Sequence, residues 1–347
     1  MHIPSRVMAD LLVPNRASVV VRASGGLSDS AVFKCDGPGE QLCLRRWSSG
    51  RSRYQYILWI QSQIAKALSA GIDPLPAHFV CSNGDPLLVD GEDVWELTQW
   101  KPGAADYLAS PSRRRLKAAA QLLARLHLVF KPDQRIQKSP AIEQRLSILD
   151  DAIRWANGIV SAQVVSSSGS AIDPTGQTQQ LIEQNLFRTQ RLVRGHGTQM
   201  LARLERLAAE PIPCHFVLRD VWSAHLLFSG DEVTGLIDFG AARIDEPATD
   251  LARMLGSLEP ADVSNWQFGF EMYRELNPDV RLQRVLLLDQ VSCLLSANQW
   301  RIWVTEQRRE FRVSVEWQVE RWKLFLDRFE HFDWRSFFQS ESDYEAI

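Results

Sequence analysis

The chain has 347 residues, of which 45% are hydrophobic and 23% charged, a composition typical of a globular protein rather than a disordered one. A chain of this length is long enough to form two packed lobes or domains. Because 39 Lys and Arg residues face 42 Asp and Glu residues, the net charge of −3 gives no indication of a nucleic-acid partner.

The sequence gives no indication of a membrane-spanning or secretory segment. The longest apolar runs are far shorter than the roughly 20 residues that a membrane span needs, so we expect no membrane partner. The opening residues MHIPSR lack the apolar core of a signal peptide. The five cysteines are scattered and form no CxxC pair, which argues against a disulfide framework and a cysteine zinc site. The expected location is the cytoplasm.

Short strands around one helix are predicted for the first hundred residues. β-branched and apolar stretches separated by Gly-rich or Asp-rich turns predict strands at residues 19–24, 31–35, 42–47, 87–89 and 94–97. Residues 54–70 carry apolar side chains near a 3.6-residue period and stop at Gly71, which predicts a helix. An antiparallel sheet with one helix follows from this pattern.

The pattern changes after Pro102-Gly103 and becomes mainly helical. Amphipathic periodicity predicts helices at 113–129, 141–157 and 179–208, short strands at 215–218, 225–228 and 233–237, and further helices in the last hundred residues. The chain is therefore expected to be α+β. We predict an N-terminal lobe at residues 1–99, a hinge at 100–103 and a helical lobe at 104–347.

Chemistry-bearing residues concentrate between positions 214 and 255. Asp220 follows an apolar strand, His225 lies five residues later, and Asp238 is part of the Ile-Asp-Phe-Gly sequence at 237–240. Two carboxylates at the ends of adjacent short strands can converge on one point. Phosphoryl transfer needs such a pair, since one accepts the proton of the substrate hydroxyl and the other holds the metal at the nucleotide phosphates.

This segment resembles the catalytic segment of the aminoglycoside phosphotransferase and choline kinase-like enzymes, relatives of the protein kinases. Their usual pattern is His-Gly-Asp, an Asn five residues after the Asp, and then Ile-Asp-Phe-Gly; the sequence DEPATDLA at 245–252 matches their Asp-Pro-x-x-Asp-Leu-Ala. The resemblance extends over nearly the whole chain. It implies a protein kinase-like bilobal fold, with a small antiparallel-sheet lobe containing one helix and a larger helical lobe with a catalytic loop at 215–228.

The resemblance assigns roles to the residues of this segment. It makes Asp220 the catalytic base and Asp238 the magnesium ligand, and it makes Asp250 a brace of the catalytic loop. His225 stands where the family has its Asn metal ligand, and imidazole suits magnesium poorly, so Mn²⁺ is an alternative. Arg219 replaces the loop glycine next to the base, where a cation could also meet a phosphate on the substrate.

The nucleotide positions depart from the family as well. Arg45 occupies the place of the phosphate-binding lysine, and we choose it over its neighbour Arg46 because alternation along a strand directs only one of them into the cleft. Gln61 stands where the lysine's helix glutamate is expected, so the usual ion pair cannot form. The resemblance places the adenine near the hinge residues Thr98 and Trp100. It places the phosphates under a small-residue loop that contains Ser24, Gly25 and Gly26.

The residues and the resemblance together favour an ATP-dependent kinase that phosphorylates a hydroxyl of a small molecule, such as a sugar or an amino alcohol, with Mg²⁺ or alternatively Mn²⁺. Trp222, in the catalytic loop, is a candidate wall of the substrate site. The alternative is a weak or inactive pseudokinase that binds a nucleotide or another ligand, which the departures at Arg45, Gln61 and His225 favour. A third reading is that only the fold is shared. The sequence selects neither a substrate nor an oligomeric state.

Overall fold

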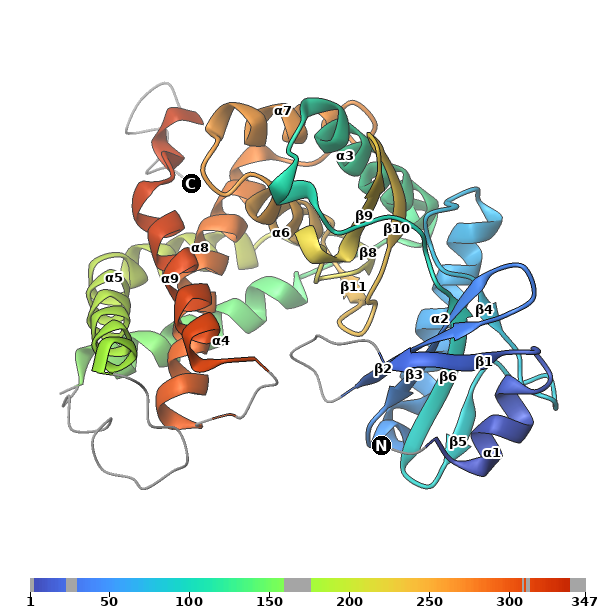
Figure 1. Cartoon of the computed structure of the whole chain (residues 1–347). Coiled ribbons are helices and arrows are strands. Elements are labelled where there is room, and N and C mark those ends of the chain that lie inside the picture. The colour runs from blue at the N-terminus through green and yellow to red at the C-terminus, as the bar shows by residue number, and fades with distance from the viewer. Residues whose placement is uncertain (1–2, 23–29, 159–175, 308, 310–312, 338–347) are drawn as a thin grey trace. The chain divides into compact units, whose positions relative to one another are not determined.

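The computed structural model describes residues 3–22, 30–158, 176–307, 309 and 313–337. The chain forms two compact units, Met1–Pro132 with Asp220–Ala242 and Asp133–Arg219 with Arg243–Ile347 (Figure 1). The segment that carries Asp220 and Asp238 therefore belongs to the same unit as the N-terminal sheet. The division of the chain into lobes at residues 100–103 stays a prediction. None of the described helices is both long and apolar enough to cross a lipid bilayer.

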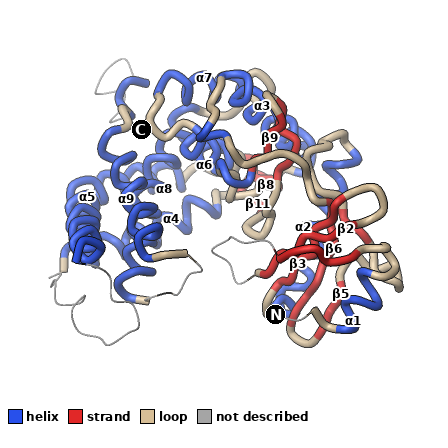
Figure 2. Tube along the Cα trace, viewed as in Figure 1, coloured by secondary structure: helices blue, strands red, loops and turns tan. Residues whose placement is uncertain are grey.

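An antiparallel sheet forms the centre of the first unit. Its strands follow the order β1-β2-β3-β6-β4, and β5 also pairs with β6 (Figures 1 and 2). The strands are β1 (Ser18–Arg22), β2 (Ala31–Asp36), β3 (Gln41–Trp47), β4 (His78–Phe79), β5 (Leu88–Asp90) and β6 (Asp93–Gln99). All five strands predicted from the sequence are present, and the two-residue strand β4 is an addition.

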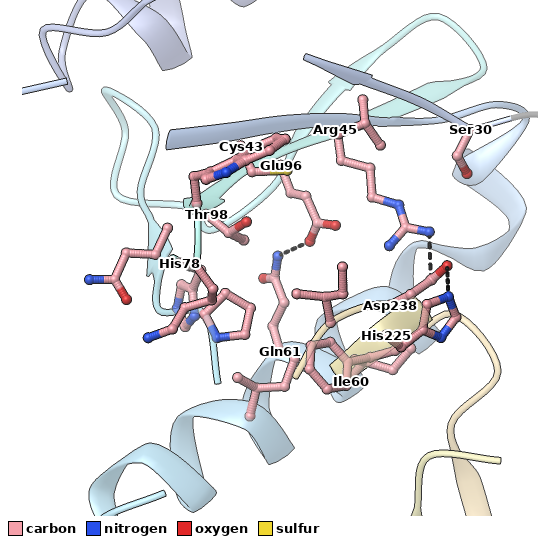
Figure 3. Close-up of a pocket in the computed structure, with 18 of the residues that line it drawn as sticks. Ser30, Cys43, Arg45, Ile60, Gln61, His78, Glu96, Thr98, His225 and Asp238 are labelled. Atoms are coloured by element: carbon pink, nitrogen blue, oxygen red, sulfur yellow. Dashed lines mark hydrogen bonds and ion pairs between the residues drawn. The ribbon is translucent and has the colours of Figure 1, made fainter. Parts of the chain in front are cut away.

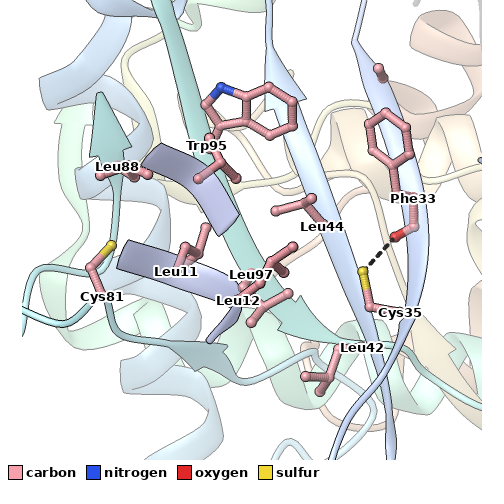
Figure 4. Packing of buried hydrophobic residues seen from close by; sticks show 12 residues of the cluster. Leu11, Leu12, Phe33, Cys35, Leu42, Leu44, Cys81, Leu88, Trp95 and Leu97 are labelled. Carbon is pink, nitrogen blue, oxygen red and sulfur yellow. Dashed lines mark hydrogen bonds between the residues drawn. The ribbon is translucent and has the colours of Figure 1, made fainter. Parts of the chain in front are cut away.

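Alternation along β3 and β6 gives the sheet two chemically different faces. Leu42 and Leu44 of β3, like Trp95 and Leu97 of β6, are buried in an apolar cluster (Figure 4). Because successive side chains of a strand point to opposite faces, the residues between them point the other way. These are Cys43, Arg45, Glu96 and Thr98, and they line a cavity.

The helices of the first unit include one that the sequence pattern did not predict. α1 (Ser5–Val7) continues as a π-helical turn (Met8–Leu12), and its Val7, Leu11 and Leu12 join the apolar cluster on the sheet (Figure 4). The segment is too short for a helical period to be recognised. The predicted helices are present as α2 (Tyr54–Ser69) and α3 (Arg113–Phe130).

A short hairpin completes the first unit. After a 3₁₀ turn (Ser223–His225), β9 (Leu226–Ser229) pairs antiparallel with β10 (Glu232–Leu236). The hairpin is attached to the rest of the unit through its backbone, since Ala104 and Phe228 exchange two hydrogen bonds of 2.9 Å and the Leu236 N–H donates to Pro74. Asp220 precedes the hairpin in the chain and Asp238 follows it, so the attachment of the hairpin helps to position both residues.

The second unit is mainly helical. Its helices are α4 (Pro140–Asn157), α5 (Gly176–Ala208), α6 (Ala248–Leu258), α7 (Val263–Arg274), α8 (Leu282–Arg301) and α9 (Val315–His331). A three-stranded antiparallel sheet of order β11-β8-β7 accompanies them, with β7 (Arg135–Gln137), β8 (Ile212–Val217) and β11 (Arg243–Asp245). The Ser139 hydroxyl caps α4, and Pro140 occupies its first turn, where no backbone N–H is required.

Removal of apolar volume from the cluster behind the sheet should destabilise the protein. Leu44 is fully buried there, so Leu44→Ala should cost about 2–5 kcal/mol of unfolding free energy. Val20, in β1 of the same sheet, is 57% exposed. Val20→Thr should therefore change the unfolding free energy by no more than about 0.5 kcal/mol. Urea unfolding followed by circular dichroism measures both, and equal shifts of the two midpoints would contradict the assigned faces.

Candidate active site

A cavity of about 340 Å³ lies within the first unit, against the polar face of the sheet (Figure 3). Strands β3 and β6, helix α2 and the segment around Asp238 all contribute to its wall. The cavity therefore collects most of the site residues predicted from the sequence that the structure describes. They are Arg45, Gln61, Thr98, Trp100, His225 and Asp238. Ser24, Gly25 and Gly26 lie outside the described residues.

An ion pair joins the sheet to the Ile-Asp-Phe-Gly segment. Nη2 of Arg45 donates to Oδ1 of Asp238 at 2.9 Å (Figure 3). The Arg45 guanidinium also lies 4.1 Å from the centre of the Trp47 ring, within cation–π range. Arg46 instead pairs with Asp93 at 3.2 Å, so the strand directs Arg45 into the cavity, as the alternation predicts.

The ion pair affects the acidity of Asp238. Burial alone would raise the pKa of this carboxyl group, but the charge and the hydrogen bond of Arg45 outweigh burial, and the pKa lies below its ordinary value. The backbone of Asp238 has φ of 64°, in the left-handed region. Since a non-glycine residue in that region costs about 1–3 kcal/mol, the surrounding contacts must hold it there. The Arg45 contact is one of them.

His225 lies between the two carboxylates that the sequence singles out. Its Nδ1 is 3.9 Å from Oδ2 of Asp220, and its Nε2 is 3.7 Å from Oδ2 of Asp238. Both predicted acidic residues are therefore neighbours of one imidazole ring. The structure brings together Asp220, His225 and Asp238, as their positions around the hairpin lead one to expect.

Trp222 holds the His225 ring in place. Its indole Nε1 donates to Nε2 of His225 at 3.0 Å, and the two rings meet edge to face at 5.3 Å. Because an indole N–H is only a donor, Nε2 accepts and Nδ1 carries the proton, which it donates to the backbone carbonyl of Asp220 at 2.8 Å. The role of Trp222 as a wall of a substrate site stays a prediction, while its bond to His225 was not anticipated.

Gln61 and a residue that the sequence analysis missed form a second polar group in the cavity. Nε2 of Gln61 donates to one carboxylate oxygen of Glu96 at 2.8 Å (Figure 3). Nε1 of Trp47 donates to the other oxygen, also at 2.8 Å. Glu96 is 8% exposed and is the cross-strand neighbour of Arg45. A carboxylate is thus present in the cavity, although α2 supplies none. The sequence signal that could have identified Glu96 was its position as a single acidic residue in the otherwise apolar run Val94–Leu97.

Two buried polar atoms in the cavity have no hydrogen-bond partner among the described residues. They are Nε of Arg45, a donor, and Oε1 of Gln61, an acceptor. Buried polar atoms normally find partners, so such atoms indicate where a ligand or water binds. The guanidinium fits an anionic group such as a phosphate, and the apolar cavity residues Val32, Ile60 and Ile64 fit a flat apolar ring.

The donor atoms near Asp238 fit a divalent cation only in part. A carboxylate oxygen suits Mg²⁺, whereas an imidazole nitrogen is more usual with transition metals. Within the part of the chain that the structure describes, the group of three metal-ligating side chains with ligand atoms within 4.8 Å of one another is Asp327, Glu330 and His331, not the residues around His225. A cation held by Asp238 would therefore need ligands from its nucleotide or from water.

The residues just before Asp220 belong to the second unit and are braced there. The backbone N–H groups of Leu218 and Arg219 donate to the two oxygens of Asp250 at 2.7 and 2.5 Å, which is the bracing role that the resemblance implies. Arg219 has φ of 63°, so this position requires the left-handed backbone that the family's glycine adopts readily. The Arg219 side chain donates to Gln144 at 2.6 Å and lies 3.8 Å from Asp245.

Comparisons with known proteins assign the chain to a family. The sequence profile of the phosphotransferase enzyme family matches residues 19–278, well over half of the chain, so the chain belongs to that family. No curated protein sequence matches it significantly. The expected protein kinase-like α+β fold is confirmed, because the similar solved structures are aminoglycoside phosphotransferases and related kinases.

Three solved structures show the extent of the likeness. An aminoglycoside phosphotransferase from Alicyclobacillus acidocaldarius is 16% identical, with 100% of this chain and 98% of that chain covered and a TM-score of 0.57. A spectinomycin phosphotransferase in complex with ADP and spectinomycin is 13% identical, covering 89% and 88%, with a TM-score of 0.56. An amicoumacin kinase with AMP-PNP and Ca²⁺ is 12% identical, covering 94% and 92%, with a TM-score of 0.59.

The Arg45–Asp238 pair should leave a signature in the acid stability of the protein. A carboxyl group with a lowered pKa contributes stability that is complete at pH values well above 3.8 and is lost as the pH falls through its folded-state pKa. Arg45→Met should therefore lower the melting temperature near neutral pH, and the difference from the wild type should narrow below about pH 4.

Thermal unfolding at a series of pH values measures this difference. Arg51→Met is the matched control, because Arg51 is an exposed arginine whose side chain donates to the backbone carbonyl of Gly91. Its effect should not vary with pH. A pH-independent difference for Arg45→Met would contradict the assigned ion pair.

Proposed function

We propose that the protein is an ATP-dependent phosphotransferase that phosphorylates a hydroxyl group of a small molecule. The observation that carries this proposal is the arrangement of Asp220 and Asp238 on either side of His225, with Asp238 at a cavity that also contains Arg45. Membership of the phosphotransferase family supports the reaction class. Two of the similar structures contain ADP or AMP-PNP, which supports a nucleotide as phosphate donor.

The nucleotide is assigned to the cavity by its chemistry. The apolar part next to Thr98 and Trp100 suits the base, and the buried Arg45 guanidinium suits the phosphates, since its Nε needs a partner. Ser24, Gly25 and Gly26 would contribute backbone N–H groups to the phosphates. Gln61 holds Glu96, and its Oε1 offers an acceptor to the ligand.

Asp238 is the proposed ligand of a divalent ion, Mg²⁺ or Mn²⁺, which when bound would neutralise phosphate charge. His225 would join it as a ligand only if its Nε2 released the Trp222 N–H that it accepts in this structure. Before the ion binds, Arg45 favours the ionised form of Asp238, because the guanidinium lowers the pKa of the carboxyl group. Burial acts in the opposite direction and raises that pKa. Trp222 fixes the orientation of the His225 ring. The amicoumacin kinase structure contains Ca²⁺, which supports the use of a divalent ion.

Asp220 is the proposed base for the acceptor hydroxyl. A carboxylate that accepts a hydrogen bond from the hydroxyl orients it and can take its proton as the new bond to phosphorus forms. Asp250 fixes the backbone that leads into Asp220. Arg219 brings a cation to the position directly before it, where it can contact an anionic part of a substrate.

A second candidate function is that of a nucleotide-binding protein with little transferase activity. The observation that favours it is the contact of Arg45 with Asp238, since a guanidinium here occupies an oxygen that a metal would need. The buried Gln61–Glu96 bond takes the place of the usual lysine–glutamate pair. Such a protein would bind ATP without consuming it.

Substitution of the two carboxylates separates these functions. Asp220→Asn should lower ATP turnover by about 10²–10⁴-fold while the thermal stabilisation by ATP and divalent metal stays. Asp238→Asn should abolish both the ATP turnover and the thermal stabilisation by ATP, because the metal loses its proposed ligand. ATP consumption with a metabolite library and thermal unfolding with and without ATP are the two measurements.

Asp231→Asn is the control for both substitutions, because Asp231 lies in the same segment at the exposed hairpin turn, beside Arg114. It should leave turnover and stabilisation unchanged. If neither Mg²⁺ nor Mn²⁺ allowed ATP to stabilise the wild type, the nucleotide assignment would be wrong. Stabilisation without any turnover across the library would select the second candidate function.

The residue at position 225 should set the metal preference. His225→Asn restores an oxygen ligand, so the ratio of Mg²⁺-supported to Mn²⁺-supported ATP turnover should rise, by about tenfold if one ligand bond changes by 1.4 kcal/mol. Initial rates at saturating concentrations of each metal give the ratio. An unchanged ratio would show that His225 does not contact the metal.

A further inference from the structure

The backbone that follows Asp238 is held by side chains at the start of α2. The hydroxyl of Tyr56, in the first turn of α2, donates to the carbonyl oxygen of Ala242 at 2.7 Å and lies 3.1 Å from that of Gly240. Nη2 of Arg53, the residue before α2, donates to the same Gly240 carbonyl at 3.3 Å. The Gly240 N–H in turn donates to Oδ1 of Asp238 at 3.4 Å. The Asp238 carboxylate is therefore tied to α2 through Gly240.

Trp47 packs against the same glycine from the end of β3. Its side chain is buried, and a Cβ added at Gly240 would lie 3.3 Å from Cζ3 and 3.4 Å from Cη2 of the indole ring. Contacts of this length are tighter than most that real Cβ atoms make, so a methyl group here would displace the ring by a few tenths of an ångström. The ring thus fits closely against a residue that has no side chain.

The Trp47 ring also contacts two charged residues of the cavity. The Arg45 guanidinium lies 4.1 Å from the ring centre, and the indole N–H donates to Glu96 at 2.8 Å. Arg45 is itself paired with Asp238, two residues before Gly240. Trp47 therefore contacts the arginine of this ion pair directly and the aspartate through Gly240.

Asp238 needs support of this kind. Its φ of 64° is unfavourable for a residue with a side chain, so its surroundings must hold the backbone in place. α2 carries no acidic residue and can give Arg45 no ion pair. The sheet and the helix are joined at this point by the packing of Trp47 and the hydrogen bonds of Tyr56 instead.

We propose that Trp47 and Tyr56 are positioning residues that set the affinity of the cavity for a nucleotide with its divalent ion. Trp47 keeps the Arg45 guanidinium and the Gly240 backbone at a fixed spacing, and Tyr56 keeps that backbone against α2. The Asp238 carboxylate is then held in place before the ion arrives, so binding does not have to order it. This inference rests on the nucleotide-dependent function proposed above.

The two residues should affect binding differently. Trp47 supports both Arg45 and Gly240, so Trp47→Leu should weaken AMP-PNP binding about tenfold or more, with and without Mn²⁺. Tyr56→Phe removes only the hydroxyl that holds the backbone after Asp238. It should leave the affinity for AMP-PNP alone unchanged and reduce the gain in affinity that Mn²⁺ gives by about three- to tenfold. Isothermal titration calorimetry of the full-length protein, in Mn²⁺ or in EDTA, measures both affinities.

Each variant has a matched control in the same unit. Trp95, in β6, is buried in the apolar cluster on the other face of the sheet, so Trp95→Leu should lower stability and leave both affinities unchanged. Tyr54 lies in the same helix as Tyr56 and packs against buried apolar residues, and Tyr54→Phe should leave the gain from Mn²⁺ unchanged. If Trp47→Leu does not fold, Trp47→Phe and Trp95→Phe make the same comparison with a smaller effect.

The contact between Trp47 and Gly240 can be tested without any ligand. Gly240→Ala should lower the folding equilibrium constant, because the added methyl group displaces the indole ring. A phenylalanine ring lacks the outer atoms that this methyl group meets. The cost of Gly240→Ala should therefore be at least about threefold smaller in Trp47→Phe than in the wild type. Urea unfolding of the four proteins measures this coupling, and equal costs in the two backgrounds would show that the contact does not exist.

The outcomes separate this inference from the kinase proposal. If AMP-PNP binds the wild type, and Trp47→Leu and Tyr56→Phe change its binding no more than their controls do, the inference is overturned and the kinase proposal stands. If only one of the two behaves as its control does, the role of that residue is overturned. If the wild type binds no AMP-PNP in Mn²⁺ or in EDTA, the kinase proposal fails and the step to nucleotide affinity fails with it, while unfolding still decides whether Trp47 and Gly240 are coupled.

Discussion

The ion pair between Arg45 and Asp238 is the contact on which the site depends. It joins β3 to a segment 193 residues later in the chain and holds a carboxylate whose backbone is in the left-handed region. Burial raises the pKa of this carboxyl group and the guanidinium lowers it, so the cation favours the ionised form that a metal ion would need. The arginine therefore keeps Asp238 ionised, yet it also occupies one of the oxygens that a metal would use. A nucleotide would resolve this conflict, since its phosphates offer the guanidinium another partner.

The departures from the family pattern have a consistent local chemistry. Glu96 gives the cavity a carboxylate that α2 lacks, and it is held by Gln61 and Trp47 rather than by a lysine. His225, oriented by Trp222, lies between the two aspartates, at the position where the resemblance leads one to expect an asparagine. Each change keeps a polar contact at its position. These contacts are compatible with transfer chemistry in which an imidazole beside Asp238 alters the metal preference.

The sequence predicted the parts of the structure that periodicity and local motifs determine. Alternation in β3 placed Arg45 rather than Arg46 in the cavity, and the strands and long helices lie where their patterns indicated. The short helix before β1 was missed, because eight residues hold barely two turns of a period. Glu96 was missed because its burial depends on partners from β3 and α2, and the bond from Trp222 to His225 depends on a turn geometry that side-chain patterns do not encode.

The central claim is that Asp238 exchanges its arginine for a divalent ion when a nucleotide binds. The most direct measurement is the electron paramagnetic resonance signal of free Mn²⁺, titrated with protein in the presence and absence of AMP-PNP. The account predicts that Mn²⁺ is bound tightly only when AMP-PNP is present, and that Asp238→Asn abolishes the protein-dependent part of this binding. Equal Mn²⁺ binding by the wild type and Asp238→Asn in the presence of AMP-PNP would contradict it.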